Sequence, residues 1–302
     1  RGVIGGIVLR VAFHTFGCKV NQFDTEGLVS TFKAAGYEVV PLSATADVYV
    51  INTCTVTKTA EQKARQVTRR IKRAHPEALV VVTGCYAQTN PEEVAALPEA
   101  DLIVGVSGRI DLVNLVTERL SGHIDSPQEC AGFSQAAKRT YVRSWTAKPG
   151  FEVYTPEFSE KTRAFLKVED GCESYCSYCK IPFARGPVRS LPSDQVRVEI
   201  NRLKEAGFKE LVLVGIHLGN YGKDLGKNLA ELLQEIAEEH RESSAFRIRL
   251  SSIEPTDFTP ELIRVVLGSS LFCPHFHIPL QSGSDTVLQR MNRPYSTRDY
   301  RE

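Results

Sequence analysis

The segment DVYVINTC (Asp47–Cys54) has the pattern of a buried β-strand that ends directly in a cysteine. Its apolar, β-branched residues predict a strand from Asp47 to Asn52. A helical pattern follows from Thr59 to His75, and Pro76 stops it. A strand followed by a helix is the repeating unit of a parallel sheet.

The same alternation extends from this unit in both directions, up to about Gly122. Further strands are predicted at Val8–Phe16, Leu79–Thr83 and Leu102–Val106. Further helices are predicted at Thr25–Ala35, Pro91–Leu97 and about Arg109–Leu120. The βαβα order predicts an α/β fold for an N-terminal domain of residues 1–125, with an open parallel sheet and helices on both faces.

The composition is that of a soluble, folded protein. The 302 residues are 42% hydrophobic and 24% charged, and 37 Lys+Arg against 36 Asp+Glu leave a net charge of +1. This length favours about two domains, and the composition excludes disorder and collagen-like structure. No apolar run approaches the ~20 residues needed to cross a bilayer, and no signal peptide is recognisable. We therefore expect a cytoplasmic protein with no membrane partner.

Three of the eight cysteines follow strands of the first domain: Cys18, Cys54 and Cys85. Ligands of open α/β sheets bind at the carboxyl ends of the strands, so these thiols should lie close together. Gly17 and Gly84 would let a bulky group approach the backbone. Three convergent soft thiolates suit an iron–sulfur cluster, while unrelated buried thiols and a zinc site are the alternatives.

The second half opens with another group of cysteines. A polar, irregular stretch at 126–160 is interpreted as an interdomain linker, and a strand then leads into GCESYCSYC (Gly171–Cys179). In this CxxxCxxC spacing, Cys172, Cys176 and Cys179 can bind three irons of a cubane cluster and leave the fourth iron open to a small molecule. Zinc would need a fourth ligand, and a disulfide would leave one thiol over.

This segment resembles the radical S-adenosylmethionine signature, with Tyr178 at the aromatic position before the last cysteine. Together with HTFGCKVN (His14–Asn21), the INTC and TGC strand ends and KIPFARGPVRS (Lys180–Ser190), it resembles the radical S-adenosylmethionine methylthiotransferase family. The resemblance extends over nearly the whole chain.

Within that family, several segments are most similar to the subgroup that acts on N6-threonylcarbamoyladenosine in transfer RNA. They are KIPFARGPVRS, GIHLGNYG (Gly215–Gly222), RLSSIEP (Arg249–Pro255) and HIPLQSGSDTVLQRMNRPY (His277–Tyr295). The subgroups that act on N6-isopentenyladenosine or on a ribosomal protein aspartate are alternatives. An iron–sulfur electron-transfer or sensing protein is an alternative of another class.

The resemblance implies two 4Fe–4S clusters and S-adenosylmethionine as cofactors. The cluster on Cys172, Cys176 and Cys179 would reduce S-adenosylmethionine to give a 5'-deoxyadenosyl radical, and the cluster on Cys18, Cys54 and Cys85 would carry the sulfur. A methylthio group would be added to C2 of the modified adenosine at position 37, in the anticodon loop of tRNA. No motif in the sequence identifies the sulfur donor or the electron donor.

The second domain, residues 161–302, is expected to be a partial radical S-adenosylmethionine βα barrel. Its strands are predicted near Arg163–Val168, Leu211–Val214, Arg247–Leu250 and Phe276–Leu280. The expected cofactor-binding residues are Tyr178, Arg189, Gly215, Ser251 and Gln281, each with an alternative role in a turn or a supporting contact. The resemblance implies further barrel strands and a C-terminal RNA-binding β-domain after Glu302, so the chain is expected to be incomplete.

The remaining expectations concern charged residues, histidines and spare thiols. The helix after Cys54 could follow RNA phosphates, or could simply present a solvated face, with Lys58, Lys63, Arg65, Arg69, Arg70, Lys72 and Arg73. Arg185 and Arg189 are expected to reach a carboxylate of the substrate or cofactor. His217 and His277 are expected to be hydrogen-bonded residues, and Cys130 and Cys273 free thiols. No catalytic residue is assigned beyond the cluster ligands.

Overall fold

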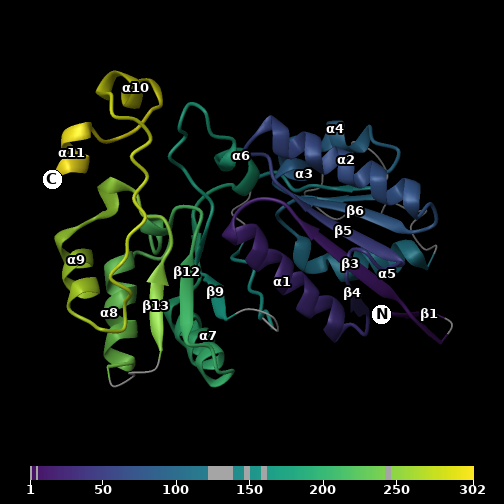
Figure 1. Ribbon diagram of the computed structural model, residues 1–302, viewed down its shortest axis with the longest axis horizontal. Coiled ribbons are helices and arrows are strands. Elements are labelled where there is room, and N and C mark those ends of the chain that lie inside the picture. The colour runs from purple at the N-terminus through teal and green to yellow at the C-terminus, as the bar shows by residue number, and fades with distance from the viewer. Residues whose placement is uncertain (1, 5, 122–138, 146–149, 158–161, 242–245) are drawn as a thin grey trace. The chain divides into compact units, whose positions relative to one another are not determined.

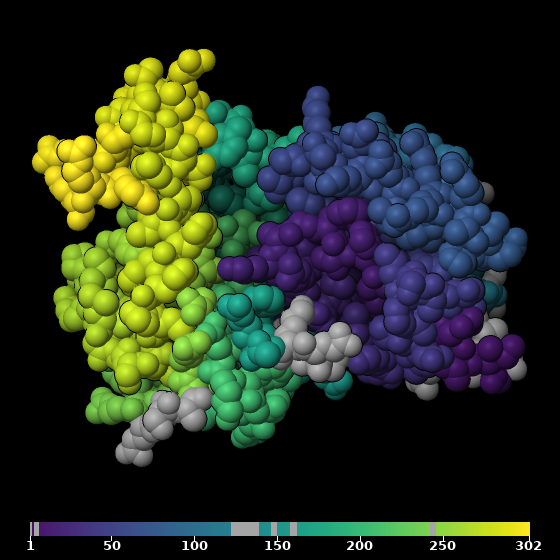
Figure 2. All heavy atoms as spheres, viewed as in Figure 1, coloured from purple at the N-terminus to yellow at the C-terminus, as the bar shows by residue number. Residues whose placement is uncertain are grey.

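A computed structural model of the chain describes residues 2–4, 6–121, 139–145, 150–157, 162–241 and 246–302. These residues group into two compact units (Figure 1). Unit 1 contains Arg1–Glu157 and Phe183–Arg185, and unit 2 contains Phe158–Pro182 and Gly186–Glu302. Figure 2 shows the two units with all heavy atoms. Among the described helices, none has the length and apolar character needed to span a membrane.

Unit 1 is built on a parallel sheet with the strand order β4-β3-β5-β6-β7-β8. Its strands are β3 (Arg10–Thr15), β4 (Glu38–Val40), β5 (Val48–Thr53), β6 (Leu79–Gly84), β7 (Leu102–Val104) and β8 (Thr140–Tyr141). Every residue of β5 and β6 is buried, as expected for central strands of a sheet that is covered on both faces. A short antiparallel pair, β1 (Val3–Ile4) and β2 (Ile7–Val8), precedes the sheet.

Helices pack on opposite faces of this sheet. The helices of unit 1 are α1 (Lys19–Ala34), α2 (Lys58–Ala74), α3 (Cys85–Thr89), α4 (Pro91–Ala95) and α5 (Leu112–Leu120), with a 3-10 turn, η1 (Arg109–Asp111), before α5. Ile71 of α2 shares a buried cluster with Ala12 of β3. Phe32 of α1 contacts Phe13, the next residue of β3, with ring centroids 5.5 Å apart. Because successive strand residues face opposite sides, the predicted two-faced α/β sheet is confirmed.

Two differences from the sequence prediction lie in unit 1. Helix α1 begins at Lys19 rather than Thr25, because the polar residues Asn21 and Asp24 of its first turns are fully buried and conceal the apolar period. Strand β8 was not predicted, since Thr140 and Tyr141 fall in the stretch interpreted as a linker. They pair with β7, so the linker interpretation is wrong for these residues.

Unit 2 contains a parallel sheet of three described strands in the order β13-β12-β9. They are β9 (Arg163–Lys167), β12 (Glu210–Val214) and β13 (Arg247–Leu250). A small antiparallel pair joins β10 (Glu169–Asp170) to β11 (Arg189–Ser190). The helices and 3-10 turns are α6 (Ile181–Arg185), α7 (Ser193–Glu205), η2 (Leu218–Asn220), α8 (Leu229–Glu239), η3 (Pro255–Asp257), α9 (Pro260–Leu267), α10 (Asp285–Arg290) and α11 (Thr297–Arg301). This is the predicted partial barrel.

The strand predicted at Phe276–Leu280 is not formed. The described residues there make only an isolated bridge between Ser252 and His277, next to a second bridge between Ile248 and Phe272. Pro274 and Pro279 lie on either side of His277 and have no backbone N–H, so a continuous ladder cannot form through them.

Candidate functional site

The three cysteines of unit 1 lie at the carboxyl ends of neighbouring strands, as the sequence predicts. Cys18 precedes α1 after β3, Cys54 follows β5, and Cys85 is the first residue of α3 after β6. Cys54 and Cys85 are buried, while Cys18 is exposed. Burial raises the pKa of Cys85, and the nearby Cys18 and Cys54 raise it further. The three thiols are thus close enough to interact electrostatically, and we call them the first cysteine group.

Two glycines make room for this group. Gly17 has φ 109° and Gly84 has φ 95°, both in the left-handed region that favours glycine. A Cβ atom on Gly17 would lie 3.2 Å from Cys54 Sγ, and a Cβ atom on Gly84 would lie 2.5 Å from the carbonyl oxygen of Thr53. Side chains at these positions would displace the backbone that carries the cysteines.

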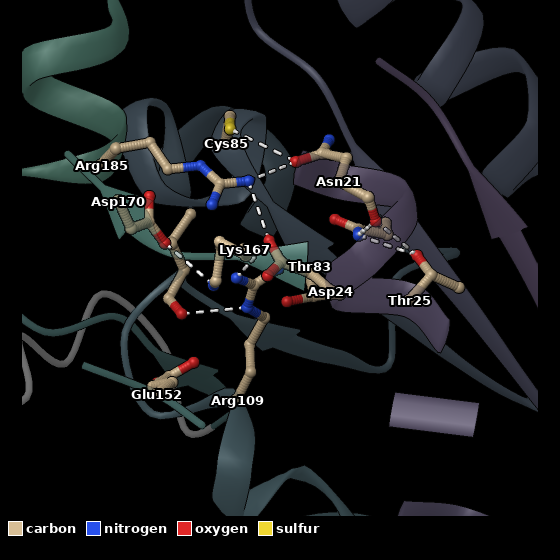
Figure 3. Close-up of polar contacts among 12 residues, drawn as sticks. Asn21, Asp24, Thr25, Thr83, Cys85, Arg109, Glu152, Lys167, Asp170 and Arg185 are labelled. Atoms are coloured by element: carbon tan, nitrogen blue, oxygen red, sulfur yellow. Dashed lines mark hydrogen bonds and ion pairs between the residues drawn. The ribbon is translucent and has the colours of Figure 1, made fainter. Parts of the chain in front are cut away.

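A buried ion network lies next to the first cysteine group (Figure 3). The Asp24 carboxylate is 2.8 Å from Arg109 Nη2 and 3.0 Å from Arg185 Nη2, and all three side chains are 0% exposed. Arg185 also donates to Asn21 Oδ1, which lies 3.9 Å from Cys85 Sγ. Arg185 was expected to reach a carboxylate of the substrate or cofactor, but its carboxylate partner is Asp24 of the same unit.

Amide side chains join the ends of β3 and β5 to the start of α1. Asn21 Nδ2 donates to the carbonyl oxygens of Phe16 and Thr53, at 2.7 and 3.1 Å. Asn52 Nδ2 donates to Asn21 O and to Thr25 Oγ1, at 3.0 and 2.9 Å. Sequence reasoning did not select Asn21, Asp24 or Asn52. The sequence signal that could have identified them is the placement of polar residues at the ends of otherwise apolar strands and in the first turns of α1.

The three cysteines of unit 2, the second cysteine group, share one loop after β10. Cys179 N donates to Cys176 O at 2.9 Å, and Cys172 Sγ lies 3.4 Å from Ser174 Oγ. Burial raises the pKa of Cys179, and the nearby Cys176 and Cys172 add to that rise. Burial also opposes ionisation of Cys172, but contacts with His217 and Ser174 outweigh it and lower the pKa of that thiol. Cys172 therefore ionises more readily than Cys179.

His217 supports this loop through hydrogen bonds. Its Nε2 lies 2.8 Å from Asp257 Oδ2, and its Nδ1 lies 3.2 Å from Ser174 Oγ. Burial lowers its pKa, but the contacts with Asp257 and Cys172 prevail and raise the pKa to about 10. The backbone N of His217 donates to Glu169 Oε2 at 2.7 Å. The role expected for His217 agrees with these contacts.

His277 and the spare thiols can also be placed. His277 Nδ1 lies 2.7 Å from Ser252 Oγ, which agrees with its expected role as a hydrogen-bonded residue. Cys273 is a buried free thiol, and Cys130 lies outside the described residues.

The expected cofactor-binding residues lie in different surroundings within unit 2. The half-exposed Tyr178 accepts a hydrogen bond from Arg293 Nη2 at 2.8 Å, and the guanidinium carbon lies 5.8 Å from its ring centroid. Arg189 is buried and donates to Pro187 O at 2.8 Å. Gln281 is exposed and has φ 63°, an uncommon conformation for a residue with a side chain.

Two of these residues, Ser251 and Gly215, lie at the ends of strands. Ser251 is buried just after β13, and its Oγ has no hydrogen-bond partner among the described residues. Gly215 follows β12, and a Cβ atom there would lie 2.7 Å from Glu169 Oε2. The Glu169 side chain is buried, and burial raises its pKa to about 8.

Each cysteine group supplies three soft thiols, the donor type of iron–sulfur clusters. In the part of the chain that the structure describes, no group of three or more His, Cys, Asp or Glu side chains is arranged to hold one metal ion. Ligands of one zinc, each bonded at about 2.3 Å, would lie within roughly 4 Å of one another. In a cubane cluster each thiolate bonds a different iron, so three soft thiols can be spaced more widely.

Comparisons with known proteins agree with this two-part organisation. Residues 166–302 match the radical SAM superfamily, and residues 10–105 match an uncharacterised protein family, UPF0004. The radical S-adenosylmethionine methyltransferase TsrM from Kitasatospora setae has a similar fold, with a TM-score of 0.66 at 15% identity over 97% of this chain and 66% of that one. The fold and sequence together define a radical SAM protein with an N-terminal UPF0004 domain.

Curated relatives narrow this class. The threonylcarbamoyladenosine tRNA methylthiotransferase MtaB of Bacillus subtilis (strain 168) is 46% identical over 95% of this chain and 60% of its own length. MtaB of Aquifex aeolicus (strain VF5) is 40% identical over 97% of this chain and 68% of its length. The chain belongs to the MtaB family of threonylcarbamoyladenosine tRNA methylthiotransferases. It spans about 60% of the length of the Bacillus relative.

Proposed function

We propose that this chain acts in tRNA methylthiolation, adding a methylthio group to C2 of N6-threonylcarbamoyladenosine at position 37. The observation that carries this proposal is the identity of 46% and 40% to two MtaB proteins over nearly the whole chain. A tRNA-2-methylthio-N(6)-dimethylallyladenosine synthase of Pelotomaculum thermopropionicum is 32% identical. The threonylcarbamoyl substrate is therefore favoured over the isopentenyl one.

Each cysteine group would hold one 4Fe–4S cluster. Cys18, Cys54 and Cys85 would bind the first, and Cys172, Cys176 and Cys179 the second. Support comes from the convergence of three thiols at strand ends in unit 1 and from the CxxxCxxC loop in unit 2. Together with S-adenosylmethionine, the second cluster supplies radical chemistry that no acid or base can replace at an unactivated aromatic C–H bond.

The protein's own residues would bind and orient the cofactor. The buried Ser251 hydroxyl has no described partner and can donate to it. Gly215 would let it approach the backbone once the Glu169 side chain moves aside, while Tyr178 and Gln281 would contact it from exposed positions. Arg189 is also proposed, although it would have to leave Pro187 O and the Asp170 carboxylate, which is 3.7 Å away, to reach the cofactor. Ser174, His217 and Asp257 would hold Cys172 in place through their hydrogen bonds.

The outer face of α2 is a candidate surface for tRNA phosphates. Three of its cations are paired with carboxylates: Arg65 with Glu93, Arg69 with Glu99, and Lys72 with Asp101. By contrast, Lys63, Arg70 and Arg73 are exposed and form no ion pair with the described residues. These three lie on the side of α2 away from its buried residues, so their charge can serve an anionic partner. A tRNA substrate would place the protein in the cytoplasm.

The proposal is tested by mass spectrometry of tRNA nucleosides from a strain that lacks the gene. The methylthio group should disappear from N6-threonylcarbamoyladenosine and return when the wild-type gene is supplied. Loss from the isopentenyl nucleoside would instead support that subgroup, and an unchanged nucleoside profile together with a change in ribosomal protein would support the aspartate subgroup.

A cofactor assay tests the alternative of an electron-transfer or sensing protein. After anaerobic reconstitution, the purified protein should carry about eight irons and cleave S-adenosylmethionine when reduced with dithionite. Iron binding without cleavage, in a strain whose nucleosides do not change, would favour electron transfer or sensing. The variant Cys18→Ala should lose about half of the iron, which separates the two cysteine groups.

A further inference from the structure

The short segment Phe183–Arg185 belongs to unit 1, although the residues on both sides of it belong to unit 2. Ala184 is fully buried in a cluster with Cys85 and Val106. The carbonyl oxygen of Phe183 accepts a hydrogen bond from Trp145 Nε1 at 2.8 Å. The segment is therefore fixed by packing and hydrogen bonding right beside the first cysteine group.

Arg185 brings a buried positive charge to that group. Its guanidinium contacts Asp24 and Asn21 and lies within hydrogen-bonding reach of the Cys85 thiol, and the Asn21 Oδ1 that it bonds is 3.9 Å from Cys85 Sγ. Figure 3 shows the Arg185 side chain pointing toward Asn21, with dashed lines from the Asn21 amide oxygen to both Arg185 and Cys85. The Arg185 and Cys85 side chains are both shielded from water.

The charges around Asp24 are unevenly distributed. Two guanidiniums share one fully buried carboxylate. On the Arg109 side, the charge of the partly exposed Glu152 adds to that of Asp24. Arg185 instead extends toward the first cysteine group, where a negative charge on sulfur would compensate it. A charge buried in a medium of low dielectric constant strongly favours a partner of opposite sign.

We propose that Arg185 is a positioning residue of the first cysteine group, and that its guanidinium bonds the Cys85 thiolate and stabilises negative charge on an iron–sulfur cluster held by Cys18, Cys54 and Cys85. This inference rests on the proposed function, because it requires that these thiols bind a cluster. Hydrogen bonds to sulfur and nearby charge are two determinants of the reduction potential of such clusters. Arg185 therefore raises the potential of this cluster relative to a neutral residue.

The experiment isolates the first group by using the chain with Cys172→Ser, Cys176→Ser and Cys179→Ser. In this background, Arg185→Met removes the charge at similar length, and Arg185→Lys keeps it. Arg109→Met is the matched control, because Arg109 shares Asp24 but donates its Nε hydrogen to Val106 O. Iron and sulfide are counted after reconstitution, folding is checked by circular dichroism, and the midpoint potential is measured by dithionite titration with electron paramagnetic resonance.

Arg185→Met should lower the equilibrium constant for one-electron reduction at least tenfold, which corresponds to about 59 mV for a one-electron couple. Arg185→Lys should change this equilibrium constant less than Arg185→Met does. Arg109→Met should destabilise the fold but change the equilibrium constant less than threefold. If Arg185→Met does not fold, Arg185→Gln takes its place, since its amide is uncharged and can still bond Asp24.

The outcomes separate the two proposals. If the background protein binds no iron, the assignment of the first cysteine group fails, and the proposed function fails with it. If it binds iron but the potential is the same with and without the Arg185 charge, the inference about Arg185 is wrong and the proposed function stands. Equal shifts for Arg185→Met and Arg109→Met would also overturn the inference, because they would reflect only the general loss of buried charge.

Discussion

Asp24 Oδ2 lies 2.8 Å from Arg109 Nη2, although 85 residues separate the two in the chain. The same oxygen is 3.0 Å from Arg185 Nη2. One carboxylate thus joins helix α1, the turn before α5 and the segment that follows the second cysteine group. Because none of these side chains is exposed, the pairing depends on how unit 1 packs as a whole.

Asp24→Asn should strongly destabilise unit 1. Removing the carboxylate charge takes from two buried guanidiniums the partner that they share, and breaking a buried ion pair on one side costs about 3–5 kcal/mol. Urea unfolding followed by circular dichroism measures the change in the free energy of unfolding. The control is Glu93→Gln, which breaks the partly exposed pair with Arg65 and should cost at most about 1 kcal/mol. A loss below about 1 kcal/mol for Asp24→Asn would contradict the buried network.

Gly84→Ala should disrupt the first cysteine group. The new Cβ atom would lie 2.5 Å from Thr53 O, so the strand ends that carry Cys54 and Cys85 would have to move. Gly36 is the matched control, because it has φ 88° and no atom within 4 Å of an added Cβ. Gly36→Ala should therefore cost only about 1–2 kcal/mol for the left-handed backbone. Unfolding and iron content after reconstitution should both be affected more by Gly84→Ala, and equal effects would argue against this packing.

Protonation of Glu210 should lower the stability of unit 2 at acid pH. Hydrogen bonds from Arg249 and Arg247 outweigh burial and lower the pKa of Glu210 to about 2, from an ordinary value of 4.5. Since the folded pKa is depressed, the stabilisation is complete above about pH 4.5 and is lost as the pH falls toward 2. The difference in melting temperature between wild type and Glu210→Gln should shrink over this interval. A difference that stays constant from pH 6 to 3 would contradict the lowered pKa.

The basic face of α2 should contribute to tRNA affinity. Arg70→Ala with Arg73→Ala removes two exposed cations that pair with no described carboxylate. Each lost phosphate contact should reduce the slope of log K against log salt by about 0.7–0.9. Lys33→Ala with Arg119→Ala is the control, because it removes the same charge from exposed positions on α1 and α5. Filter binding over a salt series measures both pairs, and identical slopes would leave α2 without a role in RNA binding.

Local patterns in the sequence predicted most of the fold. The apolar runs of β5 and β6 and the helical period of α2 specify their elements, because burial on a fixed period is a local property. Both cysteine groups were also predicted, the first from its repeated position after strands and the second from its spacing. The strand expected at Phe276–Leu280 failed because Pro279 within it and Pro274 before it remove backbone donors, which an apolar pattern does not reveal. Strand β8 is only two residues long and pairs with β7 across a long connection, so no local pattern indicated it.

The sequence by itself determined the order of strands and helices, the positions of six cysteines and the resemblance to methylthiotransferases. Tertiary structure alone decided that Asp24, Arg109 and Arg185 share one buried network, and that Arg185 pairs with Asp24 rather than with a carboxylate of the substrate or cofactor. The physical reason is that, from the sequence alone, a charged residue is expected to lie in solvent. Its burial becomes favourable only when the fold places a partner of opposite charge within hydrogen-bonding distance.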